Sequence, residues 1–385
     1  EQLLAGPLSR SYDFIRCPAN ANVDSRRSWW RSCCRHLGQL LDLARRLGPG
    51  DADLVHIHTC SGFTFYRNLV DLVVARMFGV PVVLHVHGAR FDQFCAGSGR
   101  LGRRLIRHGL TAASRVLVLS PDWRQRLQPF APQAYFTIVP NGVPCPPTAR
   151  PRHDEATEAP CRFLFLAAIC RRKGIDVLIQ AARQLHERGV GFRLTVAGPE
   201  EQPGQADQLS HDIQANRLEA CVEYVGTVTG EAKDDLLRQC DCLVLPSRAE
   251  GLPLTLLEAG ARGLAVLATT VGAIPEVITG PQFGRLVPPE DATALSAAMA
   301  DLAADGSRRT ALGEALAQRI AQHYSLQNQS ALLADVYEAL SAERAAVPPA
   351  HQADLIRIAG EDSLSRPPPA DLTRSPIRTA HEGVP

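Results

Sequence analysis

The sequence predicts an α/β fold built from two doubly wound domains with parallel sheets, facing each other across a cleft. Apolar runs of strand length alternate with amphipathic stretches of helix length, which is typical of parallel sheets covered by helices. The alternation occurs twice, and a segment rich in Pro and charge at 140–160 separates the two runs. With 385 residues, the chain is long enough for two domains with sizeable cores.

The first run predicts an N-terminal domain over residues 1–145, followed by a linker at 146–160. Its strands are expected at 53–58, 81–87, 115–120 and 135–140, and its helices at 61–78, 98–113 and 121–128. Before them, residues 25–47 carry Arg and Trp together with leucines at helical spacing. We expect an amphipathic helix that packs on the sheet through Leu37, Leu40, Leu41 and Leu43; a helix on a membrane surface is the alternative.

The second run predicts a C-terminal domain over 161–325. Several of its strands are apolar on both faces, as strands in the middle of a parallel sheet are. The expected strands are 162–168, 192–198, 222–226, 241–247, 264–270 and 284–289. An amphipathic helix at 326–344 could pack on either domain, and the Pro-rich tail at 345–385 is expected to be disordered.

Composition excludes several classes of protein. The 41 Lys and Arg residues against 40 Asp and Glu give a net charge of +1, so no global field favours nucleic acid as a partner. The 11 cysteines lack the spacing of a zinc site and are expected to be reduced thiols in a cytoplasmic protein. No apolar run approaches the roughly 20 residues of a membrane span, and the first residues lack a secretory-signal pattern.

The stretch "AEGLPLTLLEAG" (249–260) follows an apolar strand and opens a helix. Ligands of doubly wound sheets bind at the carboxyl ends of strands. Pro253 suits the first helical position, which would leave the amides of Leu254, Thr255 and Leu256 free to bind a phosphate or diphosphate. Glu250 and Glu258 would flank that anion and accept hydrogen bonds from hydroxyl groups. A nucleotide sugar has this chemistry, with a diphosphate between two polyhydroxylated groups.

Three stretches together resemble a known family. They are the two acids Glu250 and Glu258, "TTVGAIPEVI" (269–278) and "KGIDVLIQA" (173–181). The pattern, which runs from about residue 40 to about residue 343, resembles the retaining, nucleotide-sugar-dependent glycosyltransferases of family 4. The resemblance implies a GT-B fold of two Rossmann-like domains. It also implies transfer of a sugar to an acceptor hydroxyl without a required metal or further cofactor, as in bacterial polysaccharide or glycolipid synthesis.

The resemblance assigns roles to individual residues. Glu258 is implied to hold the ribose, Lys173 the diphosphate and Glu250 the transferred sugar, with His87 facing that sugar from the other domain. Glu250 and His87 are thus the expected catalytic residues. The expected donor-binding residues are Lys173, Arg172, Glu258, Gly251, Leu252, Pro253, Leu254, Thr255, Asn141 and Gly142.

Lysine is rare in this chain, which gives separate support for one of these roles. Lys173 and Lys233 are the chain's two lysines, and every other basic residue among the 41 is arginine. A lysine in the diphosphate position therefore indicates a selected, compact ammonium group. Lys233, in "GEAKDDLLRQ", is interpreted as a solvated helix residue.

The chain departs from the family pattern at two places. Ala167 and Ala168 stand where the family usually has Gly-Arg, so Arg171 or Arg172 would have to supply a second cation for the diphosphate. Residues 1–50 contain no counterpart of the family's first strand and glycine-rich loop, so the N-terminal domain is expected to lack its first strand. A nucleotide-sugar epimerase and a non-catalytic nucleotide-sugar-binding protein are therefore kept as alternatives.

Four histidines alternate along two neighbouring predicted strands, as His56, His58, His85 and His87. Alternation places each pair on one face of a strand, a spacing that could suit a metal ion. Because no carboxylate joins these four histidines, we expect hydrogen-bonded histidines at strand ends and no metal site.

A basic segment follows His87, with Phe91 and Phe94 among its arginines. Its members are Arg90, Arg100, Arg103, Arg104 and Arg107, and a second basic and aromatic cluster lies upstream at Arg26, Arg27, Trp29, Trp30 and Arg31. Such surfaces suit anionic lipid headgroups or a lipid-linked diphosphate acceptor. Two interpretations stay open: the arginines only solvate helix faces of a cytoplasmic protein, or they hold it peripherally at the inner face of a membrane.

Overall fold

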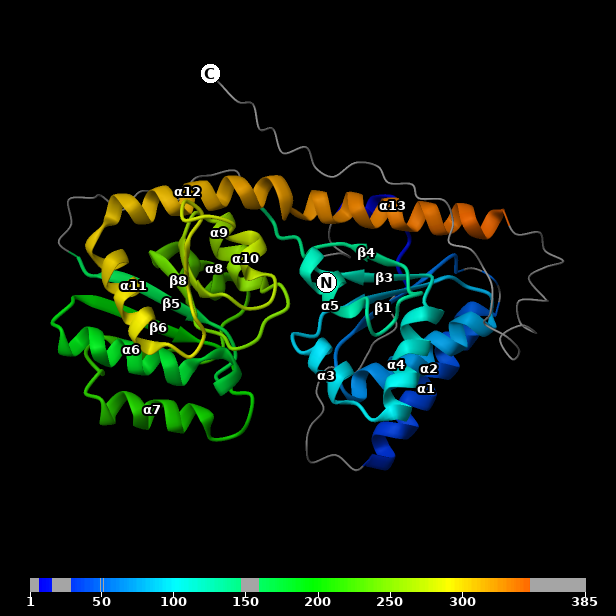
Figure 1. The fold of residues 1–385 in the computed structure, drawn as a ribbon, viewed down its shortest axis with the longest axis horizontal. Coiled ribbons are helices and arrows are strands. Elements are labelled where there is room, and N and C mark those ends of the chain that lie inside the picture. Colours follow the sequence, from blue (N-terminus) through cyan, green and yellow to red (C-terminus); the bar gives the residue numbers. More distant parts are fainter. Residues whose placement is uncertain (1–6, 16–28, 49, 51, 147–158, 347–385) are drawn as a thin grey trace, which may run out of the picture.

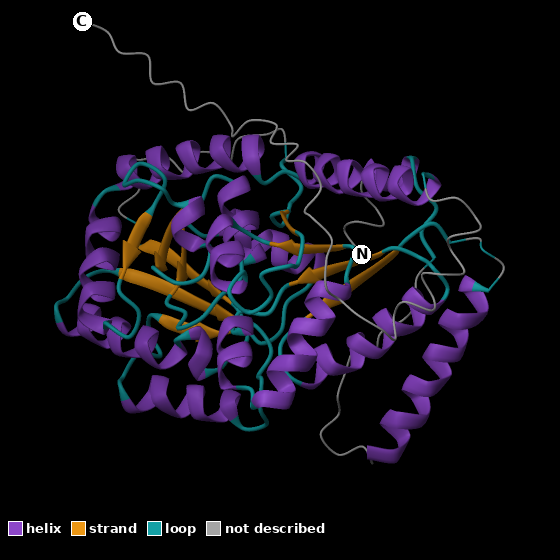
Figure 2. Ribbon diagram, turned by 45° about the vertical axis from the view of Figure 1, so that its right-hand side comes forward, coloured by secondary structure: helices purple, strands orange, loops and turns teal. Residues whose placement is uncertain are grey.

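The structure is a computed structural model that describes residues 7–15, 29–48, 50, 52–146 and 159–346, with the backbone alone for 29–35. Two parallel sheets lie side by side, one from each half of the chain (Figure 1). Helices cover both faces of each sheet (Figure 2). The predicted α/β class with two Rossmann-like parallel-sheet domains is confirmed, and each of the ten predicted strands is present.

The N-terminal sheet has the strand order β1-β2-β3-β4, which follows the chain without reversal. All its neighbouring strands pair in parallel. The strands are β1 (Val55–Thr59), β2 (Val82–Val86), β3 (Arg115–Val118) and β4 (Phe136–Ile138). The helices of this half are α1 (Trp29–Leu47), α2 (Phe63–Met77), α3 (Phe91–Gly97), α4 (Arg100–Ala112) and α5 (Pro121–Leu127).

The C-terminal sheet has the order β10-β9-β8-β5-β6-β7. Its strands are β5 (Cys161–Leu166), β6 (Phe192–Ala197), β7 (Val222–Tyr224), β8 (Cys242–Leu245), β9 (Ala265–Thr269) and β10 (Arg285–Val287). Its helical elements are η2 (Arg171–Lys173), α6 (Ile175–Glu187), α7 (Gln205–Ala215), α8 (Gly230–Gln239), α9 (Leu254–Ala261), α10 (Ile274–Val277), α11 (Ala292–Ala304) and α12 (Gly306–His323). The order reverses between β5 and β8, and open sheets bind ligands at such a reversal.

The last described helix, α13 (Leu326–Ala345), returns to the N-terminal half. Its buried residues Leu333, Val336, Tyr337 and Leu340 form one cluster with Val83, Leu117 and Val139 of the N-terminal half. Leu8 of the short helix η1 (Pro7–Arg10) joins the same cluster. In Figure 1, α12 and α13 run as an almost continuous ridge over both halves of the molecule.

Two helix predictions differ from the structure. Helix α1 packs against α2. Leu43 is buried as expected, together with Leu47, whereas Leu37 and Leu41, which were also expected to pack, are 58% and 50% exposed. The predicted helix at 98–113 is preceded by a separate helix, α3, which begins at Phe91, a residue whose side chain is fully buried. The first difference arises because apolar spacing does not reveal which neighbour a helix covers.

The described residues before β1 form η1 and α1, so the expectation that the N-terminal domain lacks its first strand stays a prediction. The predicted linker and tail lie mostly outside the described residues, as 147–158 and 347–385. Across the part of the chain that the structure describes, no helix combines the length and hydropathy needed to cross a bilayer.

Candidate functional site

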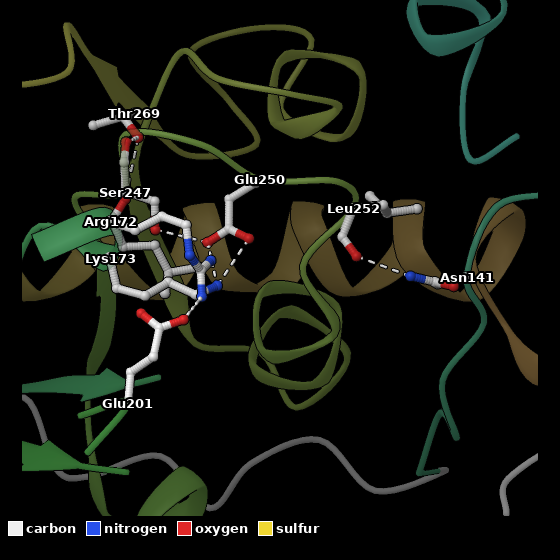
Figure 3. A network of polar contacts seen from close by, with 9 residues as sticks. Asn141, Arg172, Lys173, Glu201, Ser247, Glu250, Leu252 and Thr269 are labelled. Atoms are coloured by element: carbon white, nitrogen blue, oxygen red, sulfur yellow. Dashed lines mark hydrogen bonds and ion pairs between the residues drawn. The ribbon is translucent and has the colours of Figure 1, made fainter. Parts of the chain in front are cut away.

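The motif loop, residues 246–253, connects β8 to α9 at the carboxyl edge of the sheet. Glu250 in this loop is only 5% exposed. The Ser247 hydroxyl donates to Glu250 Oε1 at 2.7 Å, and Thr269 donates to the Ser247 carbonyl at 2.6 Å (Figure 3). A neighbouring strand thus fixes the serine, which in turn orients the carboxylate.

Lys173 ends the short helix η2 and forms an ion pair with Glu250. Its Nζ lies 2.7 Å and 2.9 Å from the two carboxylate oxygens, and the two side chains are 17% and 5% exposed. Burying an ion pair requires desolvation that the attraction offsets only with good geometry, so such pairs are weak evidence for a stabilising role. Lys173 and Glu250 stand 77 positions apart in the sequence, and the fold brings them together at the place where a ligand site is expected.

The turn that presents Lys173 is fixed by Gly174. This residue has φ of +76°, and a Cβ added to it would lie 1.9 Å from the Pro246 carbonyl oxygen. Both the left-handed conformation and the close contact require glycine. The Arg248 amide donates to the Arg172 carbonyl at 2.8 Å, so the motif loop and the lysine turn are held together as one unit.

Glu258, in α9, is 6% exposed and pairs with the chain's other lysine. Lys233 Nζ, from α8, donates to Glu258 Oε1 at 2.8 Å. The interpretation of Lys233 as a solvated residue is therefore wrong: its side chain is 30% exposed and turned toward α9. The Arg262 to Asp234 pair, at 2.6 Å, connects the same two helices. Each acid of the motif thus has a lysine partner.

Helix α9 begins at Leu254, and Pro253 is the residue that precedes it. Pro253 therefore occupies the N-cap position and not the first helical position as predicted. Its extended backbone, with ψ of 121°, directs the chain into the helix. The amides of Leu254, Thr255 and Leu256 still form the free first turn, whose dipole favours an anion.

The stretch "TTVGAIP" packs on the back of the motif loop. Gly272 has φ of +57°, and a Cβ added there would lie 2.1 Å from the Glu250 carbonyl oxygen. The Ala273 amide donates to the Gly251 carbonyl at 2.9 Å. This stretch therefore holds the backbone of the motif loop in place.

The N-terminal half contacts the motif loop through several residues, among them His87, Leu119 and Asn141. A Cβ added to Gly251 would lie 3.2 Å from the His87 carbonyl oxygen, so this glycine sits against the end of β2. The Asn141 amide nitrogen donates to the Leu252 carbonyl at 2.9 Å. Asn141 thus fixes the loop, and its predicted contact with the donor stays a prediction.

Gly142, the next residue, packs against the start of α13. A Cβ added to it would lie 2.7 Å from the Ser325 carbonyl oxygen and 2.8 Å from the Gln329 side chain. The space beside Gly142 is therefore filled by protein. Its direct contact with a donor stays a prediction, and its position in the structure serves the packing of the two halves.

The candidate second cation, Arg172, pairs with an acid of its own. Its Nη2 lies 3.2 Å from Glu201 Oε1, and its side chain is 28% exposed beside Lys173 (Figure 3). Hydrogen bonding from Cys170 and pairing with Arg172 hold the pKa of Glu201 below its ordinary value. Arg171, in contrast, is 84% exposed and lies near Asp176. Both arginines contact the motif loop through their carbonyl groups, but it is the side chain of Arg172 that lies beside Lys173 (Figure 3).

The four histidines form a compact stack on β1 and β2. His58 Nδ1 lies 2.8 Å from His87 Nε2, and His56 Nε2 lies 3.3 Å from His85 Nδ1. His56 Nδ1 also lies 2.5 Å from the Tyr337 hydroxyl of α13. Burial lowers the pKa of all four rings, and with the added effect of His58 it lowers the pKa of His87 to about 3. The imidazoles are therefore neutral at pH 7.

Three of these histidines have nitrogen atoms within 4.8 Å of one another, as a shared metal ion would require. Their rings, however, are stacked: His56 and His58 have centroids 4.5 Å apart and planes 16° apart, and the planes of His58 and His85 differ by 28°. A metal binds an imidazole nitrogen in the plane of the ring. Nearly parallel, stacked rings cannot aim their lone pairs at one point without turning, so the arrangement favours hydrogen bonding.

The basic segment is only partly as predicted. Arg90, Arg100, Arg103 and Arg104 are exposed, but Phe91 is fully buried and Phe94 is half-buried in an aromatic cluster with Phe65. The expected role of these two phenylalanines at a membrane surface is therefore wrong, because they belong to the core. The apolar groups on the exposed face of α4 are Leu101 and Leu105, at 71% and 38% exposure. The side chains of the upstream cluster (Arg26, Arg27, Trp29, Trp30 and Arg31) lie outside the described part of the chain.

Comparison with known proteins identifies both halves. Residues 9–142 match the glycosyl transferase 4-like domain, and residues 150–319 match glycosyl transferases group 1. The amylovoran biosynthesis glycosyltransferase AmsK of Erwinia amylovora is 36% identical over 37% of this chain and 36% of its own length. The lipopolysaccharide core biosynthesis mannosyltransferase LpcC of Rhizobium leguminosarum is 30% identical over 53% of this chain and 60% of its own length. The chain thus spans less than two thirds of the length of these relatives.

Solved structures support the same fold. The sucrose-phosphate synthase of Thermosynechococcus elongatus superposes with a TM-score of 0.68 at 21% identity, covering 80% of this chain and 79% of that one. The Anabaena protein HepE, solved in complex with UDP, has a TM-score of 0.67 at 16% identity, covering 78% and 82%. With a 4-like domain, a group 1 domain and this two-domain fold, the chain belongs to the GT-B glycosyltransferases that resemble family 4.

Proposed function

We propose that the chain transfers a sugar from a nucleotide-diphosphate sugar to an acceptor hydroxyl, with retention of the anomeric configuration. The observation that carries this proposal is the arrangement of the motif: two buried acids, each beside a lysine, with a free helix N-terminus between them. The HepE structures with UDP and with UDP-glucose support the choice of donor class.

The donor would extend along the motif from one acid to the other. The diphosphate would lie at the first turn of α9 and at Lys173, where backbone amides and an ammonium group offer positive charge. Arg172 would leave Glu201 to supply the second cation. Glu258 would accept hydrogen bonds from the ribose, and Glu250 from the transferred sugar. Gly251 and Leu252 would carry the chain close to the anion without a bulky polar side chain.

The reaction requires one bond to form and one to break at the anomeric carbon. The bond from this carbon to the leaving diphosphate oxygen breaks, and the acceptor oxygen bonds to the same face. The acceptor's proton passes to the leaving phosphate oxygen. Lys173 and the α9 dipole would stabilise the charge on the leaving group, so we propose that no metal is required. His87, being neutral, would hydrogen-bond the sugar without adding charge.

The acceptor class follows from the relatives, whose names describe amylovoran and lipopolysaccharide core biosynthesis. We propose a growing polysaccharide or a lipid-linked sugar. Incubation with a panel of nucleotide-diphosphate sugars, with and without such acceptors and in the presence of a chelator, tests the function. Transfer must depend on the acceptor; conversion of the donor without one would indicate an epimerase, and nucleotide binding with no conversion under any condition would indicate a binding protein.

The exposed face of α4 is proposed to hold the protein at an anionic membrane surface, where a lipid-linked acceptor would lie. Its arginines surround the exposed Leu101 and Leu105, a pattern suited to lipid headgroups. The protein should sediment with anionic vesicles at low salt and release at high salt. Charge reversal of Arg100, Arg103 and Arg104 should abolish sedimentation and leave nucleotide affinity intact.

A matched control reverses three exposed arginines of the C-terminal half, Arg183, Arg188 and Arg217. This variant changes the net charge equally, so it should still sediment with the vesicles if the α4 face is responsible. Equal loss in both variants would show that only net charge matters. Indifference of the unmodified protein to anionic vesicles would exclude the membrane proposal.

A further inference from the structure

The two lysines of this chain occupy equivalent places in the motif. Every other basic residue among the 41 is arginine, yet both buried acids of the motif are paired with lysine. Lys173 comes from η2 and contacts Glu250, and Lys233 comes from α8 and contacts Glu258. The first pair lies beside the proposed diphosphate. In the second pair, Glu258 is proposed to bind the ribose, but the function argued so far assigns no role to Lys233.

The contact between Lys233 and Glu258 is set up by the packing of two helices. Arg262, the residue that follows α9, donates both to the Glu258 carbonyl, at 3.1 Å, and to Asp234 of α8, at 2.6 Å. This double contact connects α8 to the C-terminal end of α9. Lys233 therefore reaches Glu258 from a held position, and a carboxylate that is 6% exposed receives a charge partner.

Lysine suits this position better than arginine for a geometric reason. A guanidinium group tends to bind both oxygens of a carboxylate in a planar fork, whereas an ammonium group acts as a compact point charge. Lys233 contacts Oε1 of Glu258. The second oxygen is not used in that contact, and it can accept hydrogen bonds from a ligand's hydroxyl groups.

We propose that Lys233 is a positioning residue for the nucleoside half of the donor. It neutralises Glu258 and orients the carboxylate, so that one oxygen faces the ribose hydroxyls. Lys173 and Lys233 then divide the donor between them, one serving the diphosphate and the other, through Glu258, the nucleoside. This inference rests on the proposed function, because it needs a nucleotide in the site.

Calorimetric titration with two probes separates the two roles. The probes are inorganic pyrophosphate and the nucleoside diphosphate that the wild-type chain binds most tightly among UDP, GDP, ADP and dTDP. Lys233→Met keeps the side-chain stem and should weaken the nucleoside diphosphate about tenfold while changing pyrophosphate less than about twofold. Lys173→Met should weaken both probes. A Lys233→Met variant that binds the nucleoside diphosphate like wild type would overturn the inference.

Three further variants test whether Lys233 acts through Glu258. In a Glu258→Gln background, Lys233→Met should add no further loss of affinity, because the partner is already gone; full additivity would contradict the proposal. Lys233→Arg should restore thermal stability but not nucleotide affinity, since a guanidinium group occupies both oxygens. Wild-type affinity in Lys233→Arg would also contradict it. Arg238→Met, which removes an exposed pair on the same helix, is the matched control and should bind normally.

Acylation of lysine amines in the unmodified protein gives a second readout, which does not require any variant to fold. Mass spectrometry should show that the nucleoside diphosphate protects both Lys173 and Lys233, and that pyrophosphate protects Lys173 alone. Protection of Lys173 without Lys233 by the nucleoside diphosphate would overturn this inference and leave the proposed function standing. Absence of binding and of protection with every nucleotide would overturn both.

Discussion

The two sides of the site carry their polar groups in different ways. On the C-terminal side, two buried acids pair with two lysines. On the N-terminal side, four imidazoles contact one another and Tyr337, and burial keeps them neutral. The difference teaches where charge is needed. In the proposed function, a diphosphate would leave from the C-terminal side, while the N-terminal side would only hydrogen-bond neutral hydroxyls.

The charged side should depend most strongly on the exact place of the lysine turn. Gly174→Ala introduces a Cβ that meets the Pro246 carbonyl oxygen at 1.9 Å, in a left-handed residue. Gly189→Ala is the matched control, because Gly189 has φ of +69° and open space around it. We expect losses of about 3 kcal/mol and about 1 kcal/mol in the free energy of unfolding, measured by chemical denaturation. Equal losses would show that the contact with Pro246 relaxes easily.

Neutral substitutions on the two sides should have unequal effects on turnover. Glu250→Gln removes a charge that contacts Lys173, and it should lower kcat about 100-fold with a smaller change in nucleotide affinity. His87→Gln replaces one neutral group by another, and it should lower kcat only about tenfold. Steady-state kinetics and calorimetry measure both effects. Full activity of Glu250→Gln would show that this residue is only a loop acid.

The neutral side should make stability depend on pH. Burial holds the pKa of His85 well below its ordinary value, so the folded chain excludes a proton that the unfolded chain accepts below about pH 6.5. The free energy of unfolding should therefore be highest above about pH 6.5. As the pH falls below that value, it should decrease by up to about 1.4 kcal/mol per pH unit for each such histidine.

His85→Gln removes one of these titrating groups and should make the loss of stability below pH 6.5 less steep. The exposed His211 provides the matched control, because His211→Gln should leave the slope unchanged. Unfolding free energies measured between pH 5.5 and 7.5 give both slopes. An unchanged slope in His85→Gln would mean that the folded histidine stack takes up protons freely.

The fold could be predicted from the sequence because each strand is a short apolar run bounded by turn residues. Strand β8 illustrates this, because its residues are buried on both faces of the sheet. The loop that follows it ends in a proline just before the helix. The partner of α1 could not be predicted, since an apolar stripe fits a helix as well as a sheet. Phe91 likewise belongs to the core, although its basic neighbours suggested a surface.

The site could be predicted only in part. Glu250, Glu258 and Lys173 stand in recognisable motifs, so their sequence context indicated a site. The Lys233 contact was missed because Lys233 and Glu258 stand 25 positions apart on two helices, and helical spacing alone does not tell which face of α8 turns toward α9. The rarity of lysine in this chain could have indicated it. That rarity supported a functional role for Lys173, and it applied equally to Lys233.

The central claim is that the two lysine–acid pairs form the binding site for a nucleotide-diphosphate sugar. Calorimetric titration of the preferred nucleoside diphosphate into wild type, Lys173→Ala and Glu258→Ala tests it most directly, with Arg183→Ala of the exposed surface as control. We predict that each of the two site variants loses about 2 kcal/mol or more of binding free energy and that the control loses none. Unchanged affinity in both site variants would contradict the account.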